Sequence, residues 1–143
     1  MRMIGRHVSA LVMALSLATP ALSAAQDCLH GANATDEQTV RRKTALAATR
    51  QVNTLQANGS VAKGGRYLSQ LEMAEAYAGQ LKKRPAATPL SFDRSGEIIP
   101  GWRLTFDLTE SGYWFMIKDT TDPCGFAYIS NANGVIYTAE PIR

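Results

Sequence analysis

A change in hydrophobic spacing at Pro100–Gly101 constrains this chain more than any other feature. Before that point, apolar residues recur at steps of three and four, which places them on one narrow face of a helix; they include Ala45, Ala48, Val52 and Leu55. After it, residues 102–108 alternate apolar and polar, as in a half-buried strand. Helices followed by strands predict an α+β fold.

The first helix is predicted to begin at Thr35, which is followed three residues later by Gln38 in the pattern of a capping box. Its apolar stripe is expected to begin at Val40, and the helix to run to about Ala57. Asn58–Gly59 is expected to end it, because both residues tolerate left-handed geometry. The narrow, alanine-rich stripe is expected to pack on the domain's own sheet.

A second capping box, Ser69 to Glu72, predicts a shorter helix over about Gln70 to Leu81. Pro85 and Pro89 prevent its continuation. Its apolar side is predicted to consist of Leu71, Ala74, Tyr77, Ala78 and Leu81. The basic residues 82–84 are read as a solvated helix end, where cations suit the helix dipole, rather than as a binding patch.

Residues 85–101 form a long connection rich in proline and glycine, with room for a short edge strand at 90–93. Four strands are predicted after it, at residues 102–108, 113–118, 126–130 and 135–138. Residues 113–118 are aromatic and branched throughout, which predicts a central strand with both faces engaged. Because the connections are short, the strands should form a four-stranded antiparallel meander against which both helices pack.

Residues 1–25 have the organisation of a signal peptide. Arg2 and Arg6 precede an apolar run over residues 8–18, and small residues lead to a cleavage site after Ala25, or alternatively after Ser23. The run is shorter than the roughly 20 apolar residues that span a bilayer, so no membrane anchor is expected after cleavage. Residues 26–143 would form a single exported domain, with 26–38 as an irregular lead-in, in the periplasm or outside the cell.

The charge balance of the exported part gives no sign of a nucleic-acid partner. Loss of Arg2 and Arg6 lowers the Lys and Arg count from 15 to 13, against 12 Asp and Glu, so the net charge falls to about +1.

Two cysteines, Cys28 and Cys124, remain after cleavage and predict one disulfide in an exported protein; free thiols or pairing between chains are the alternatives. His30 lies two residues from Cys28 on the lead-in, a weak arrangement for a nucleophile. Catalytic residue types are few and unclustered, so we expect a protein that is not an enzyme and uses no cofactor.

Asp119 and Asp122 are the candidate metal ligands, since their carboxylates could contribute to a calcium site in the loop 119–125. Two carboxylates fall short of the six to eight oxygens that calcium takes, unless backbone carbonyls contribute. Aspartate and threonine also favour turns through hydrogen bonds to the backbone, and this interpretation is preferred, so no metal site is predicted.

Aromatic side chains dominate the predicted strands, and most are expected in the core. Because side chains alternate along a strand, Tyr113 and Phe115 must face away from Trp114 and Met116. One of these sets lies on the sheet face opposite the helix, and an uncovered face would offer an aromatic patch. The candidate binding residues are Tyr113, Trp114 and Tyr128.

Two segments bear a family resemblance. Residues 44–71, with Asn53–Thr54 and Gly65–Tyr67, resemble the C-terminal half of the long helix and the following loop of type IV pilins and type II secretion pseudopilins. Residues 122–143 resemble the last hairpin of exported, pilin-headgroup-like bacterial proteins. The resemblance implies a pilin-headgroup-like fold that acts by protein–protein contact. The chain lacks the family's processing site and hydrophobic helix, which puts assembly into a fibre in doubt.

The sequence thus predicts an exported, non-enzymatic structural or interaction protein that acts on a protein partner in the cell envelope. The alternative is a secreted module that binds a small ligand or a glycan through an aromatic sheet face.

Overall fold

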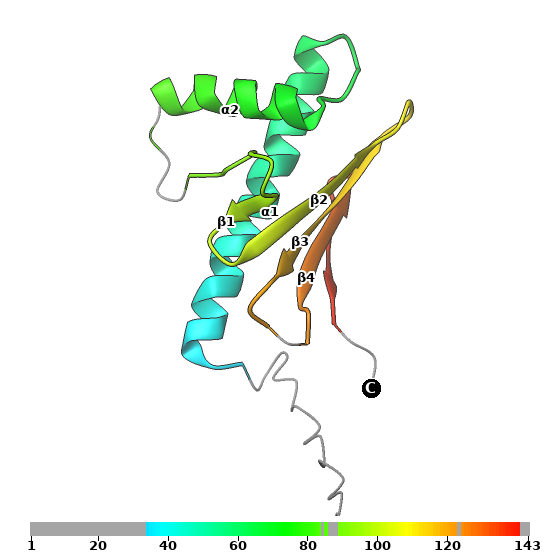
Figure 1. Cartoon of the computed structure of the whole chain (residues 1–143). Helices are drawn as coiled ribbons and strands as arrows, with labels where there is room; N and C mark the ends of the chain where they lie inside the picture. The colour runs from blue at the N-terminus through cyan, green and yellow to red at the C-terminus, as the bar shows by residue number, and fades with distance from the viewer. Residues whose placement is uncertain (1–33, 84, 86–88, 123, 141–143) are drawn as a thin grey trace, which may run out of the picture.

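The computed structural model (Figure 1) describes residues 34–83, 85, 89–122 and 124–140. It contains α1 (Asp36–Ala62), α2 (Gln70–Lys83), β1 (Glu97–Ile99), β2 (Trp102–Leu108), β3 (Tyr113–Asp119), β4 (Ala127–Asn131) and β5 (Ile136–Ala139). The five strands form one antiparallel sheet in the order β1-β2-β3-β4-β5. The α+β class and the meander are confirmed, but the sheet has five strands rather than four. Both helices were predicted to pack on the sheet, whereas α2 packs mainly against α1.

The additional strand, β1, lies within the predicted connection at residues 97–99 instead of at 90–93. Ile98 and Ile99 are buried, at 0% and 3% exposure, so this segment supplies apolar surface to the core. Ser91 N donates to Ile98 O at 2.8 Å. Residues 90–93, predicted as an edge strand, thus run beside β1 and are joined to it by this backbone hydrogen bond.

The first helix begins as predicted. Gln38 N donates to Thr35 Oγ1 at 3.2 Å, and Thr35 N donates to Gln38 Oε1 at 2.9 Å, which completes the capping box. The predicted stripe is buried, with no member more than 3% exposed: Ala45, Ala48, Val52 and Leu55. Val40 is 62% exposed, so the buried stripe begins at Ala45, beyond the first turn.

The predicted end of the first helix is wrong, because α1 continues through Asn58–Gly59 to Ala62. A Cβ added to Gly59 would lie 2.3 Å from Leu68 Cδ1, so the glycine allows the segment after α1 to pack closely against it. The chain turns instead at Gly64 and Gly65, whose φ angles are 66° and 98°.

Gln56 of α1 holds the segment that follows the turn against the helix. It is fully buried; its Nε2 donates to Leu68 O, and its Oε1 accepts from Leu68 N, both at 2.8 Å. Both backbone groups of Leu68 are thus satisfied inside the core by a side chain of α1.

The second helix begins with the predicted capping box: Ser69 N donates to Glu72 Oε2 at 2.9 Å, and Glu72 N to Ser69 Oγ at 3.3 Å. Its buried face consists of Met73 and Tyr77. The predicted apolar side is only partly right: Tyr77 is buried and Leu81 packs against the core, but Leu71 is 70% exposed and Ala78 is also exposed. Capping fixes where α2 begins, but its packing against α1 selects which side is buried.

The sheet has one covered and one open face. Phe106 of β2 pairs with Phe115 of β3, which pairs with Ser130 of β4, and all three face the helices. Along β3, buried residues alternate with exposed or half-buried ones, so the prediction that both of its faces are engaged is wrong. Helix α1 packs on the sheet mainly at β4 and covers one face (Figure 1).

Arg41 joins the start of α1 to the far end of the sheet. Its Nη2 donates to Asp119 Oδ1 at 2.8 Å, and its guanidinium lies 5.9 Å from the centroid of the Trp102 ring.

In the described residues, no helix is both long and apolar enough to cross a membrane. The predicted signal peptide and lead-in, residues 1–33, lie outside that part of the chain.

Candidate functional site

An apolar platform occupies the open face of the sheet; we define it as Trp114, Met116, Ile129 and Tyr137. Met116 pairs with Ile129, and Ile129 with Tyr137, so three strands contribute side by side. Trp114 lies two residues from Met116 on the same face. Trp114 is 40% exposed and Tyr137 is 55% exposed. These large side chains are accessible from the side of the sheet opposite α1.

The platform is flanked by charge at both ends. Asp107 pairs with Trp114 in register, and Trp114 Nε1 donates to Asp107 Oδ2 at 3.1 Å, which fixes the indole. At the other end, Arg103 and Lys118 pair with each other and are exposed. The open face therefore has an acidic end, an apolar middle and a basic end.

The structure does not bring the three candidate binding residues together. Trp114 lies on the open face, whereas Tyr113 and Tyr128 face the helices and are only 6% and 7% exposed. Burial raises the pKa of Tyr113 to about 12 and also raises the pKa of Tyr128. Both tyrosines are neutral at physiological pH, and of the three candidates only Trp114 lies on the open face.

A polar network that sequence reasoning missed holds Tyr113. The Tyr113 hydroxyl donates to Asn53 Oδ1 at 3.0 Å, and Asn53 Nδ2 donates to Ser130 Oγ at 2.8 Å. Ser130 is fully buried, and its hydroxyl also donates to Val135 O at 2.8 Å. A signal was present in the sequence: the polar residues Thr49 and Gln56 continue the helical spacing of the stripe, so this side of α1 is not purely apolar.

The two candidate metal ligands take part in the β3–β4 loop. Asp119 is 7% exposed; its Oδ1 accepts from Arg41 and from the backbone N of Thr121 (2.9 Å). Asp122 accepts from the backbone N of Cys124 at 2.8 Å. Within the residues that the structure describes, no three or more His, Cys, Asp or Glu side chains group as a metal site would need.

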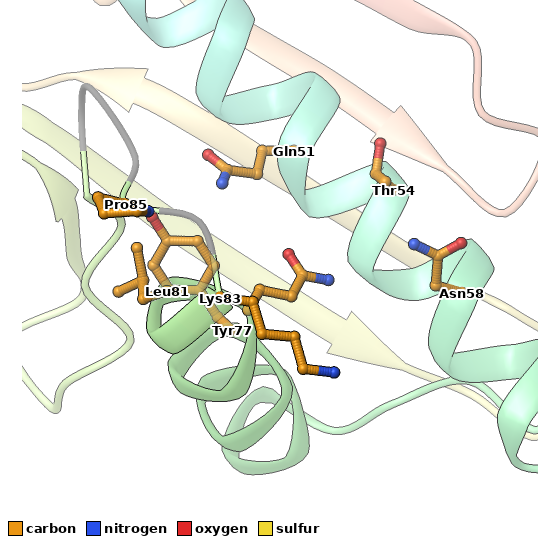
Figure 2. Close-up of a pocket in the computed structure, with 8 residues that line it drawn as sticks. Gln51, Thr54, Asn58, Tyr77, Leu81, Lys83 and Pro85 are labelled. Carbon is orange, nitrogen blue, oxygen red and sulfur yellow. The ribbon is translucent and has the colours of Figure 1, made fainter.

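A cleft of about 460 Å³ lies between the two helices (Figure 2). Its lining residues are Gln51, Thr54 and Asn58 of α1, Tyr77, Gln80, Leu81 and Lys83 of α2, and Pro85. The Tyr77 hydroxyl already accepts a hydrogen bond from Leu90 N at 3.0 Å. The cleft therefore offers carboxamides, one ammonium group and apolar surface from Leu81 and Pro85.

A second cleft, here called the turn cleft, lies beside the β4–β5 turn and has a volume of about 430 Å³. It is lined by Asn53, Thr54, Ala57, Ser60, Tyr67, Tyr113, Ala132, Asn133 and Gly134. Tyr67 packs edge-on against Tyr113, with ring centroids 4.9 Å apart. Every side chain in this lining is uncharged at neutral pH.

One cysteine of the predicted disulfide, Cys124, lies in the β3–β4 loop. The other, Cys28, and the nearby His30 lie outside the described residues. The Cys28–Cys124 bond stays a prediction.

Comparison with known proteins adds no relative: the chain matches no family model, no curated protein and no solved structure. The pilin-like resemblance is therefore still a prediction, and the open sheet face and the two clefts are the features from which a function can be inferred.

Proposed function

We propose that this is an exported, non-enzymatic interaction protein with a pilin-like head, which acts by protein–protein contact in the bacterial cell envelope. The observation that carries the proposal is the platform of Trp114, Met116, Ile129 and Tyr137 on the open sheet face. Contiguous exposed apolar surface with a polar rim is typical of protein interaction sites. Tryptophan and tyrosine are also enriched among the residues that contribute most to binding.

The charges around the platform support a partner of defined orientation. Asp107 lies at one end, and Arg103 with Lys118 at the other. Charged groups at the rim of an interface contribute more to orientation and association rate than to affinity. A partner with the opposite arrangement of charges would therefore dock in one direction.

Site-specific photo-crosslinking in the producing cells tests this proposal. A photoreactive residue in place of Met116 should give a discrete adduct with a protein partner or with a second copy. The same residue in place of Leu71, which is 70% exposed on α2, should not give that adduct. Equal adducts from both positions, or none from Met116, would contradict the proposal.

A second candidate, glycan binding by the open face, is favoured by one observation: the Trp114 indole is 40% exposed and is fixed by Asp107. A fixed aromatic ring suits stacking on a sugar. The other tryptophan, Trp102, is 1% exposed, so a change in tryptophan fluorescence on adding glycans would report on Trp114. Saturable quenching that disappears in Trp114→Phe, with no protein adduct, would favour this candidate.

Export itself and the Cys28–Cys124 disulfide belong to the same proposal. The mass of the protein from the producing cells, measured with and without reductant, would locate the cleavage site near Ala25. It would also show whether Cys28 and Cys124 are linked.

A further inference from the structure

We infer that the turn cleft is a binding site for a neutral carbohydrate of about disaccharide size. This inference does not depend on the proposed function, because Thr54, Ser60, Tyr67 and Asn133 of the cleft are distinct from the platform. Its volume of about 430 Å³ falls in the range of small-molecule sites in proteins.

The absence of charge among its lining residues sets this cleft apart from the three others described in this structure. The interhelical cleft contains Lys83. A cleft beside α2 contains Asp93 and Arg94, and one beside β1 contains Asp93 and Glu97. A lining of amides, hydroxyls and tyrosines offers no counter-charge to an ionic ligand, because burying an unpaired charge is costly. It matches a ligand that is polar and uncharged.

The polar side chains that line the turn cleft divide into those hydrogen-bonded to described residues and those that are not. Asn53 is engaged by Ser130 and Tyr113. By contrast, no described residue is hydrogen-bonded to the hydroxyls of Ser60 and Tyr67 or to the Asn133 carboxamide. These groups can both donate and accept, as the hydroxyls of a sugar require.

The aromatic part of the cleft is packed against the core. Tyr67 is half-buried and packs against Tyr113, which stacks in turn on Phe115 with centroids 6.1 Å apart. Aromatic rings present an apolar face beside a polar group, which suits the mixed surface of a sugar ring. Because Tyr113 is also held by Asn53, its ring is positioned before a ligand arrives, which lowers the cost of ordering this side of the cleft on binding.

The test is a titration of the ¹⁵N-labelled exported protein with cellobiose, maltose and chitobiose, and with glucose 6-phosphate as a charged probe, followed by NMR. At least one neutral disaccharide should cause saturable shifts at the backbone amides of Ser60, Tyr67 and Asn133. Glucose 6-phosphate should bind more weakly. If no neutral disaccharide shifts these resonances saturably, the inference is wrong.

Variants localise the site. The triple variant Ser60→Ala/Tyr67→Phe/Asn133→Ala removes the unpaired groups and should weaken binding at least about tenfold, since each lost hydrogen bond contributes modestly. Its NMR spectrum shows directly whether the fold is retained. Asn58→Ala/Gln80→Ala, in the interhelical cleft, should bind as the unmodified protein does. Binding that survives the triple variant, or that is abolished by Trp114→Phe alone, would overturn the inference and, in the second case, assign the sugar to the platform.

Discussion

The two faces of the sheet are built from the same strands, yet neighbouring residues on them differ sharply. Phe115 is fully buried beneath α1, whereas Trp114, next to it in the chain, is 40% exposed. Asp107 satisfies the Trp114 indole on the open face, and Asn53 satisfies the Tyr113 hydroxyl on the covered face. Size and aromaticity therefore do not decide which residues form the core; the position of α1 does.

This contrast separates stability from binding within one sheet. On the covered face, aromatic rings and a buried polar network are engaged with one another, so changes there should affect folding. On the open face, the aromatic side chains Trp114 and Tyr137 are exposed to solvent. Changes there should therefore affect contact with other molecules more than folding. A pair of substitutions, one on each face, would sharpen or break this contrast.

The largest effect is expected from Phe115→Ala. Removing a fully buried phenylalanine should lower the free energy of unfolding by about 3–5 kcal/mol, from lost burial and the cavity left behind. Trp114→Ala removes a larger side chain and should cost no more than about 1.5 kcal/mol, because much of it is already in water. Urea unfolding of both variants measures the difference. Similar losses would mean that the open face is covered.

A smaller effect is expected from glycine substitutions in the two helices, one in α1 and one in α2. The two changes in the free energy of unfolding should have opposite signs. Gly59→Ala places a methyl group 2.3 Å from Leu68 Cδ1, and the overpacking cost of about 1–3 kcal/mol should exceed the gain in helix propensity. Gly79→Ala meets nothing within 4 Å and should stabilise by about 0.5–1 kcal/mol. The thermal midpoints should therefore move in opposite directions. Stabilisation by both substitutions would contradict the close packing at Gly59.

The smallest effect is expected at the exposed start of α2. Hydrogen bonds from Arg66 (2.6 Å), and then from Ser69, lower the pKa of Glu72 well below its usual value of 4.5. A carboxyl group with a lowered folded pKa contributes stability above its unfolded pKa and loses it as the pH falls further. Glu72→Gln should therefore flatten the fall in the urea midpoint between about pH 6 and about pH 3. Glu75→Gln, an exposed position on the same helix, serves as the control for the loss of one negative charge. Equal pH profiles of the two variants would contradict the contribution of the Arg66–Glu72 pair.

Periodicity and capping were readable from the sequence because they depend on near neighbours. The stripe of α1 from Ala45 onward, both capping boxes and the alternation in β2 over residues 102–106 were predicted correctly. Each depends on residues within a few positions of one another. Among the candidate site residues, the alternation also placed Trp114 and Met116 together, opposite Tyr113.

Predictions failed where distant contacts overrule local preference. Asn58–Gly59 is a good helix stop by itself, but Leu68 packs against Gly59 and the helix continues. Leu71 fits an apolar side of α2, but the orientation set by Met73 and Tyr77 leaves it in solvent. The turn cleft could not be predicted for the same reason, because Ser60, Tyr67 and Asn133 meet only in the folded chain.

The bond between Asn53 and Ser130 joins residues 77 positions apart. Each pair of neighbouring strands, by contrast, is joined by a short connection, so the sheet can pair locally at a low cost in loop entropy. Synthesis runs from the N-terminus, so α1 is made before any strand on which its stripe could pack. Helix α1 packs on the sheet mainly at β4, so its stripe lacks that part of the sheet until β4 has been synthesised.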